Sequence, residues 1–189
     1  MSKRTATLGV VIHTTAGNSA NTPEQVQNFF LNILRWSRGG YHNIYSQDGR
    51  KREYYNWRDE WTNGILPGGQ YHNFNTIHLS YIGGINNRNQ NEAVCNISPK
   101  QEEAIVADLK TILAFYPSVK ILGHNQVNQK ACPSFWVPDW LRAWGFEEKN
   151  IETRDPFRLK DWVKRLPHPP DFYKNRDGKR ICECCGQRI

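Results

Sequence analysis

The sequence predicts an α/β fold with a central mixed β-sheet of about five strands flanked by helices, followed by a C-terminal helix and tail. Short runs rich in valine and isoleucine alternate with longer segments whose apolar residues recur at helical spacing. Two of the helical segments begin with a capping-box motif followed by proline, which marks their first turn. We divide the 189 residues into a domain of residues 1–146 and an extension of residues 147–189.

The chain begins with a strand and a helix. Residues 7–13 (TLGVVIH) are too short for a helix and are typical of a central strand covered on both faces, with His13 at its end. A helix then begins at Thr22-Pro23 and is expected to stop at Gly39-Gly40. Its apolar residues should form one face against the sheet, and they are Val26, Phe29, Phe30, Ile33 and Leu34.

A hairpin, a loop and a third sheet strand follow. Residues 41–46 and 51–57 are expected to pair across Asp48-Gly49. Residues 58–74 are punctuated by glycine and proline and predict a long loop, whose aromatic residues either stack on sugar rings or buttress the loop. The aromatic candidates at this place are Trp57, Trp61 and Tyr71. Residues 76–82 (TIHLSYI) alternate and are β-rich.

The second half of the chain again alternates predicted strands, loops and helices. Residues 85–96 are polar and rich in asparagine, which predicts a loop. A helix should run from Ser98 to Pro117, followed by a short strand over 119–122 and a brief helix over 138–144. In the extension, a further helix is expected at about 155–166, and then a proline-rich and basic tail.

Composition limits the classes of partner. The net charge of +7 and a pI of about 9.2 favour an anionic partner, either nucleic acid or a cell wall. A nucleic-acid-binding protein would more often carry a dense basic stripe or a recognisable module, so we regard nucleic acid as the weaker alternative. No apolar run approaches the roughly 20 residues of a membrane span. The N-terminal apolar run is only about five residues long, so we expect cytoplasmic synthesis without a signal peptide.

The stretch 124–135 (HNQVNQKACPSF) contains the main candidate site. His124 and Cys132 offer a nitrogen and a sulfur ligand for zinc, and His13 is available as a third. Three protein ligands leave the fourth tetrahedral position open, which is typical of a catalytic site. The alternative is that these residues are ordinary loop and core residues, because a histidine and a cysteine at this spacing also occur by chance.

Four blocks in order resemble a known family. VVIHTTA, GYHNIYSQDG, NTIHLSYIGGI and GHNQVNQKACPSFW are similar to the type-2 zinc-dependent N-acetylmuramoyl-L-alanine amidases, which include amidase-type phage lysozymes and peptidoglycan recognition proteins. The resemblance covers roughly residues 7–145. It implies that His13, His124 and Cys132 bind Zn²⁺ and that Tyr41 and Lys130 are catalytic. Members of one branch carry a glutamate near Ser80, so its absence points to the branch that uses tyrosine and lysine. Glycine is usual in the family where this chain has His78.

The resemblance also implies a function. We expect a peptidoglycan hydrolase that cleaves the amide bond between N-acetylmuramic acid and L-alanine of the stem peptide, in phage or prophage lysis or as a delivered effector. The alternative is a catalytically silent protein of the same fold that binds peptidoglycan or inhibits an enzyme. Retention of a cysteine at position 132 favours the enzyme. We expect a monomer, and a regulatory protein partner is conceivable because some phage lysozymes of this type bind an RNA polymerase.

The tail carries a separate motif. Cys182, Cys184 and Cys185 precede Gly186, which resembles half of a zinc-ribbon knuckle. A bound metal there would need a second half, from His168 or another chain. We favour a disordered basic tail, and an odd total of five cysteines favours reduced thiols over a disulfide framework.

Overall fold

The computed structural model describes residues 3–4, 6–65, 69–157, 173–176 and 179–182. Its centre is a five-stranded sheet in the order β3-β2-β4-β1-β7. Neighbouring strands are parallel, except that β3 runs antiparallel to β2 at one edge. The strands are β1 (Gly9–Thr14), β2 (Asn43–Tyr45), β3 (Lys51–Glu53), β4 (Thr76–Tyr81) and β7 (Lys120–Gly123). The predicted mixed sheet is confirmed.

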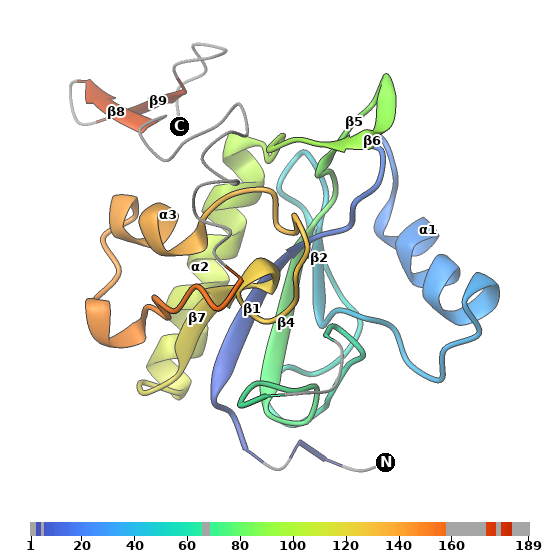
Figure 1. Ribbon diagram of the computed structural model, residues 1–189, viewed down its shortest axis with the longest axis horizontal. Helices are drawn as coiled ribbons and strands as arrows, with labels where there is room; N and C mark the ends of the chain where they lie inside the picture. Colours follow the sequence, from blue (N-terminus) through green and yellow to red (C-terminus); the bar gives the residue numbers. More distant parts are fainter. Residues whose placement is uncertain (1–2, 5, 66–68, 158–172, 177–178, 183–189) are drawn as a thin grey trace.

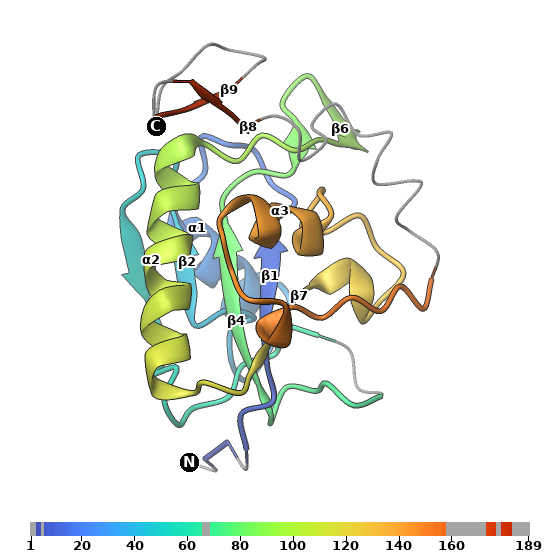
Figure 2. The same ribbon diagram turned by 90° about the vertical axis from the view of Figure 1, so that its left-hand side faces the viewer.

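Helices cover the sheet on both faces (Figures 1 and 2). The long helix α2 (Pro99–Phe115) and the short α3 (Val137–Ala143) lie on one face, and α1 (Pro23–Asn28) lies on the other. As predicted, α2 begins with a capping box in which the Ser98 side chain accepts a hydrogen bond from the Gln101 amide. No helix in the described part of the chain is long and apolar enough to cross a membrane.

Strand alternation gives the two faces of the sheet different chemistry. On β1 and β4, one set of alternate residues packs with the α2 side in the main core, for example Ile12 and Leu79. The other set points to the opposite face, where a two-residue period places polar side chains on neighbouring strands. These polar residues are His13 on β1, and His78 and Ser80 on β4, and all three are completely buried. One face of the sheet is therefore apolar, and the other carries the imidazoles of His13, near the carboxyl end of β1, and His78, in the middle of β4.

The first helix differs from the prediction. After α1 the chain forms a π-helical turn, η1 (Phe29–Ile33), and the helical stretch ends well before Gly39. Val26 and Phe30 are buried, whereas Phe29, Ile33 and Leu34 are exposed. A π turn takes more residues than an α turn, so it rotates the following side chains away from the face that α1 buries. The expected continuous apolar face on the sheet was wrong.

The segment after β4 also differs from the expected loop. It forms a hairpin of β5 (Ile85–Asn86) and β6 (Asn89–Ala93), seen at the upper edge of Figure 1. The Asn86 side-chain oxygen accepts a hydrogen bond from the amide of Arg88, which closes an Asx-type turn. The asparagines that predicted a loop therefore reverse the chain between two short strands.

The chain returns to the sheet after α3. After η3 (Glu148–Asn150), Ile151 forms a parallel bridge with Ile121 of β7. The helix expected at about 155–166 falls mostly on residues outside the described part, and the described Pro156 and Phe157 form a turn. Further on, β8 (Tyr173–Arg176) and β9 (Lys179–Cys182) pair as a hairpin. Cys184 and Cys185 lie outside the described residues, and the division at residue 146 stays a prediction.

Candidate metal centre and active site

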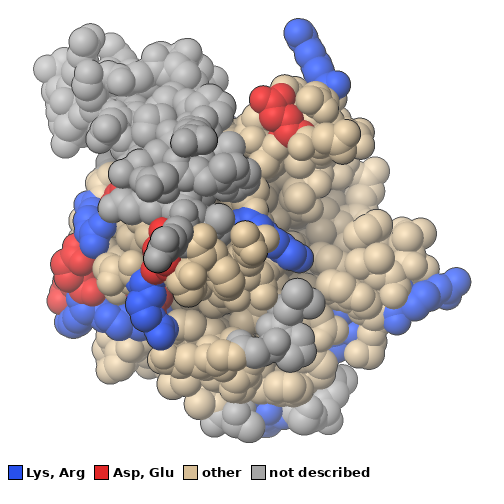
Figure 3. All heavy atoms as spheres, in the orientation of Figure 1, with Lys and Arg blue, Asp and Glu red and all other residues tan. Residues whose placement is uncertain are grey.

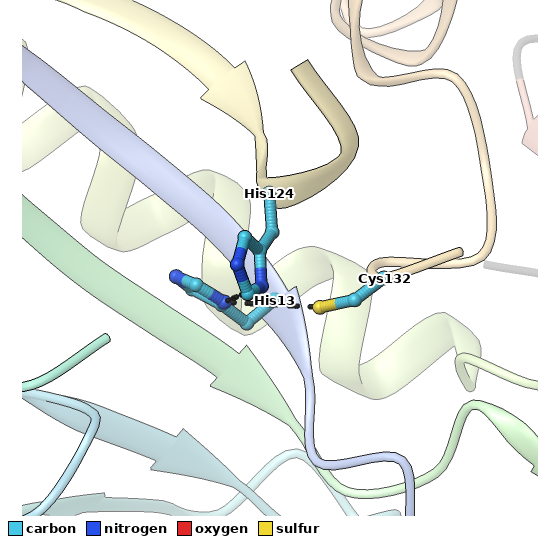
Figure 4. A group of neighbouring side chains, drawn as sticks. All are labelled: His13, His124 and Cys132. Atoms are coloured by element: carbon cyan, nitrogen blue, oxygen red, sulfur yellow. Dashed lines mark hydrogen bonds between the residues drawn. The ribbon is translucent and has the colours of Figure 1, made fainter. Parts of the chain in front are cut away.

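The three predicted ligands lie together at the carboxyl ends of two adjacent strands (Figure 4). His13 is near the end of β1, and His124 opens η2 (His124–Gln126) directly after β7. Cys132 comes from the loop that follows. The distance from His13 Nδ1 to His124 Nδ1 is 3.1 Å, and that to Cys132 Sγ is 3.7 Å. The three ligand atoms all lie within 4.8 Å of one another.

Hydrogen bonds on the outer side of each ring determine which nitrogen carries the proton. His124 Nε2 lies 2.8 Å from Asn128 Oδ1, an oxygen that can only accept, so Nε2 is protonated and Nδ1 keeps its lone pair. His13 Nε2 lies 3.0 Å from His78 Nδ1 on the neighbouring strand. Burial lowers the pKa of His124 to about 4 and that of His13 well below its ordinary value, so both rings are neutral.

The donor set fits a zinc ion. If Nε2 carries the proton on both rings, the lone pairs of His13 and His124 face each other across 3.1 Å, which is repulsive unless a cation lies near them. Zn–N bonds of about 2.0 Å and Zn–S bonds of about 2.3 Å at tetrahedral angles place donors about 3.3 to 3.6 Å apart. Two of the three observed separations, 3.1 and 3.7 Å, are close to these values, and the third is within 4.8 Å. Two imidazoles and a thiol are also ligand types that zinc prefers.

The thiol of Cys132 is held beside β1. The amide of Thr14 donates a hydrogen bond to Sγ over 3.2 Å, which favours a thiolate. Without a metal, burial raises the pKa of Cys132 to about 12, although the Thr14 amide and the nearby Lys130 oppose this rise. A cation that binds here must therefore displace a proton from Cys132.

Tyr41 lies against the same cluster, just before β2. Its ring centroid is 5.0 Å from that of His13, and its hydroxyl donates a hydrogen bond to the Thr14 carbonyl over 3.4 Å. Burial, and next the neighbouring Cys132, raise the pKa of Tyr41. The hydroxyl therefore stays protonated at neutral pH and remains a hydrogen-bond donor.

A cleft opens above these side chains. It has a volume of about 490 Å³, within the roughly 300 to 1,000 Å³ of ordinary ligand sites. Tyr41, His124 and the exposed Lys130 line it together, and the stacked rings of Phe30 and Trp36 form one wall. In the space-filling view the surface is hollowed between the middle of the molecule and the α1 side (Figure 3).

Comparison with known proteins finds relatives of this chain. No protein-family model matches the chain. The endolysin of Escherichia phage T7 is 32% identical over 120 residues, which are 64% of this chain and 72% of that protein. The chain belongs to the type-2 amidase family, together with the endolysins of phages T7 and T3.

Solved structures show the same fold at low sequence identity. PGRP-SA of Apis mellifera superposes with a TM-score of 0.61 at 18% identity, over 81% of this chain and 90% of that one. The N-acetylmuramoyl-L-alanine amidase LysC of Clostridium intestinale gives a TM-score of 0.52 at 19% identity, over 67% and 76% of the two chains.

None of the three aromatic candidates is among the residues that line this cleft. Trp57 and Tyr71 are 5% and 4% exposed, and the first packs edge-on against Phe115 of α2. Trp61 packs against Phe74 and lies under the Arg38 guanidinium. The stacking role considered for Trp57 and Tyr71 was therefore wrong, because Trp57 packs against α2 and Tyr71 packs with Val11 and Leu122 on the other face of the sheet.

Sequence reasoning missed the residues that hold the ligands. Asn128 carries no signal in the sequence beyond its spacing of four from His124. His78 contacts His13 directly, and the sequence did not indicate which neighbour this histidine would meet. Its alternation on β4 places it on the correct face, and this was the one available signal.

Proposed function

We propose that this chain is a zinc-dependent N-acetylmuramoyl-L-alanine amidase that cleaves the bond between the lactyl group of N-acetylmuramic acid and L-alanine. The coarser statement, that it is a member of a peptidoglycan-hydrolysing endolysin family, follows from its relatives. The observation that carries the proposal is the convergence of two imidazole nitrogens and one sulfur beneath a cleft that Tyr41 and Lys130 also line.

His13, His124 and Cys132 would hold the metal. When bound, zinc supplies Lewis-acid polarisation of the substrate carbonyl and activation of water. The neutral imidazoles offer their Nδ1 lone pairs, and Cys132 gives up its proton to bind as a thiolate. The complete burial of His13 excludes bulk water from that side, which strengthens electrostatic interactions within the cleft.

Tyr41 and Lys130 would stabilise the negative charge that develops on the carbonyl oxygen during attack. The Tyr41 hydroxyl remains protonated and can donate a hydrogen bond to this oxygen, while the Lys130 ammonium supplies a positive charge from the cleft wall. Donors of this kind are worth about 2 to 4 kcal/mol each. We also assign to Lys130 the delivery of a proton to the departing amine.

Mass spectrometry of purified peptidoglycan tests the reaction. The protein would be incubated with peptidoglycan as isolated, after chelation, and after zinc is restored. We expect free stem peptides that begin with L-alanine, lost on chelation and regained with zinc. If glycan and peptide stay joined on walls of several chemotypes, the protein is a wall-binding or inhibitory member of the fold instead.

A further inference from the structure

His78 forms the middle of a hydrogen-bonded chain that ends at the candidate metal site. The Thr76 hydroxyl donates its single proton to the His72 carbonyl over 2.7 Å, so its oxygen must accept from His78 Nε2 at 2.9 Å. With the proton on Nε2, the Nδ1 atom of a neutral His78 is an acceptor. The partner of this acceptor is His13 Nε2, at 3.0 Å.

The ring of His78 is neutral and held from several sides. Burial, together with the nearby His42, lowers its pKa well below the ordinary value. Its backbone amide donates to His42 Nδ1 over 2.9 Å, and the His42 ring stacks beside it. Gly64 covers the ring so closely that a Cβ at that position would overlap its Nδ1 and Cγ atoms. The imidazole therefore has little freedom to turn.

We infer that His78 is a positioning residue for the metal centre: it holds His13 in the Nε2–H tautomer, with the Nδ1 lone pair directed at His124 and Cys132. This inference rests on the zinc site of the proposed function. Partners that fix the unligated nitrogen of a histidine ligand typically change metal affinity about 10- to 100-fold. Thr76 acts one step further out, because its oxygen fixes the tautomer of His78.

The test compares His78→Asn with His78→Leu in the full-length protein. These two side chains have nearly the same size, and the Asn carbonyl oxygen can occupy the place of His78 Nδ1 and accept from His13. Zinc affinity would be measured by competition with a chromophoric chelator. We expect His78→Leu to bind zinc about 10- to 100-fold more weakly than wild type, and His78→Asn to remain within about threefold. Equal affinities for the Leu variant and wild type would overturn the inference.

Two variants of Thr76 and a spectrum of the wild-type protein provide a test that does not depend on whether the His78 variants fold. Thr76→Val removes the acceptor and should weaken zinc binding about three- to tenfold, whereas Thr76→Ser should not. In metal-free wild type, long-range ¹H–¹⁵N spectra should show His13 protonated at Nε2, and protonation at Nδ1 would contradict the inference. If wild type itself binds no zinc, the proposed function fails first, so the two failures can be told apart.

Discussion

The two imidazoles of the candidate site are neutral, and each is hydrogen-bonded on the side that faces away from the cluster. Asn128 fixes the ring of His124, and the Thr14 amide contacts the sulfur of Cys132. The Asn128 contact leaves the His124 Nδ1 lone pair directed into the cluster, whereas Cys132 must still lose its proton when a cation binds. Tyr41 also keeps its proton, because its raised pKa leaves the hydroxyl as a hydrogen-bond donor near the place proposed for the reacting carbonyl.

Replacing Tyr41 with phenylalanine tests its assigned role. We expect Tyr41→Phe to retain zinc and lower kcat by about 10²- to 10³-fold, because one donor to the developing oxyanion is lost. Tyr54→Phe is a matched control, since Tyr54 packs in the same apolar cluster as Tyr41. Its rate should equal that of wild type. An unchanged kcat in Tyr41→Phe, measured on peptidoglycan, would remove Tyr41 from the mechanism.

The sequence could predict part of this site at the residue scale. His13 ends a buried strand and His124 follows another, so their approach at one sheet edge could be expected once the strands were identified. The contact of His78 with His13 could not be predicted, because it depends on β1 and β4 being neighbours with Val11 opposite His78. That register appears only when the whole sheet is assembled.

At the element scale, loop residues 58–65 and 69–75 cover the face of the sheet that carries the imidazoles. Gly64 in this loop meets His78, and a Cβ there would also approach the Gly40 carbonyl oxygen to 2.7 Å. We expect Gly64→Ala to destabilise the fold by about 1 to 3 kcal/mol and to weaken zinc binding, because it displaces the ring that holds His13. Chemical denaturation and chelator competition measure the two effects.

Gly69→Ala is the control for that loop. Its φ of +75° makes alanine strained, but no atom lies within 4 Å of the added Cβ. This variant should lose stability without losing zinc affinity. If Gly64→Ala keeps wild-type zinc affinity while Gly69→Ala loses it, the contact between Gly64 and His78 is not what couples the loop to the metal.

The returning segment after η3 is fixed to the domain by Glu152, which is 8% exposed. Burial alone would raise the pKa of Glu152, but hydrogen bonds from Arg154 and Tyr71 outweigh it and lower the pKa to about 2. A depressed carboxyl pKa stabilises the folded state above the unfolded value of about 4.3, and the contribution disappears as pH falls toward 2.

Glu152→Gln should therefore destabilise the protein in a pH-dependent way. We expect a loss of about 1 to 3 kcal/mol in the free energy of unfolding at pH 7, shrinking progressively between about pH 5 and pH 2. Urea denaturation at several pH values measures it. Glu147→Gln is the control, because the Glu147 ion pair with Lys149 is exposed and should contribute little at any pH. A pH-independent difference for Glu152→Gln would contradict the assignment.

Local sequence patterns predicted most helices and strands, and they failed where contacts between distant segments determine the structure. The capping boxes of α1 and α2 and the Asp48-Gly49 turn could be read directly from the sequence. The π turn at Phe29–Ile33 could not, because its apolar residues fit an ordinary α-helix equally well. The hairpin over 85–93 was missed because asparagine side chains, not an apolar pattern, close its turn.

At the scale of the whole molecule, the parallel strands β1 and β7 bring the ligands to one edge of the sheet. Ligands of α/β proteins commonly bind beyond the carboxyl ends of such strands. Among the described residues on the face drawn in Figure 3, basic side chains are dispersed and most of the surface is uncharged.

The most direct test of the central claim compares two variants for bound zinc and for release of stem peptides. His13→Ala removes a ligand, whereas Lys130→Ala removes a charge that lines the cleft without holding the metal. We predict that His13→Ala loses both zinc and activity. Lys130→Ala should retain about one zinc per chain and be about 10²- to 10³-fold slower. Zinc-free protein with full activity, in either variant or in wild type, would contradict the account.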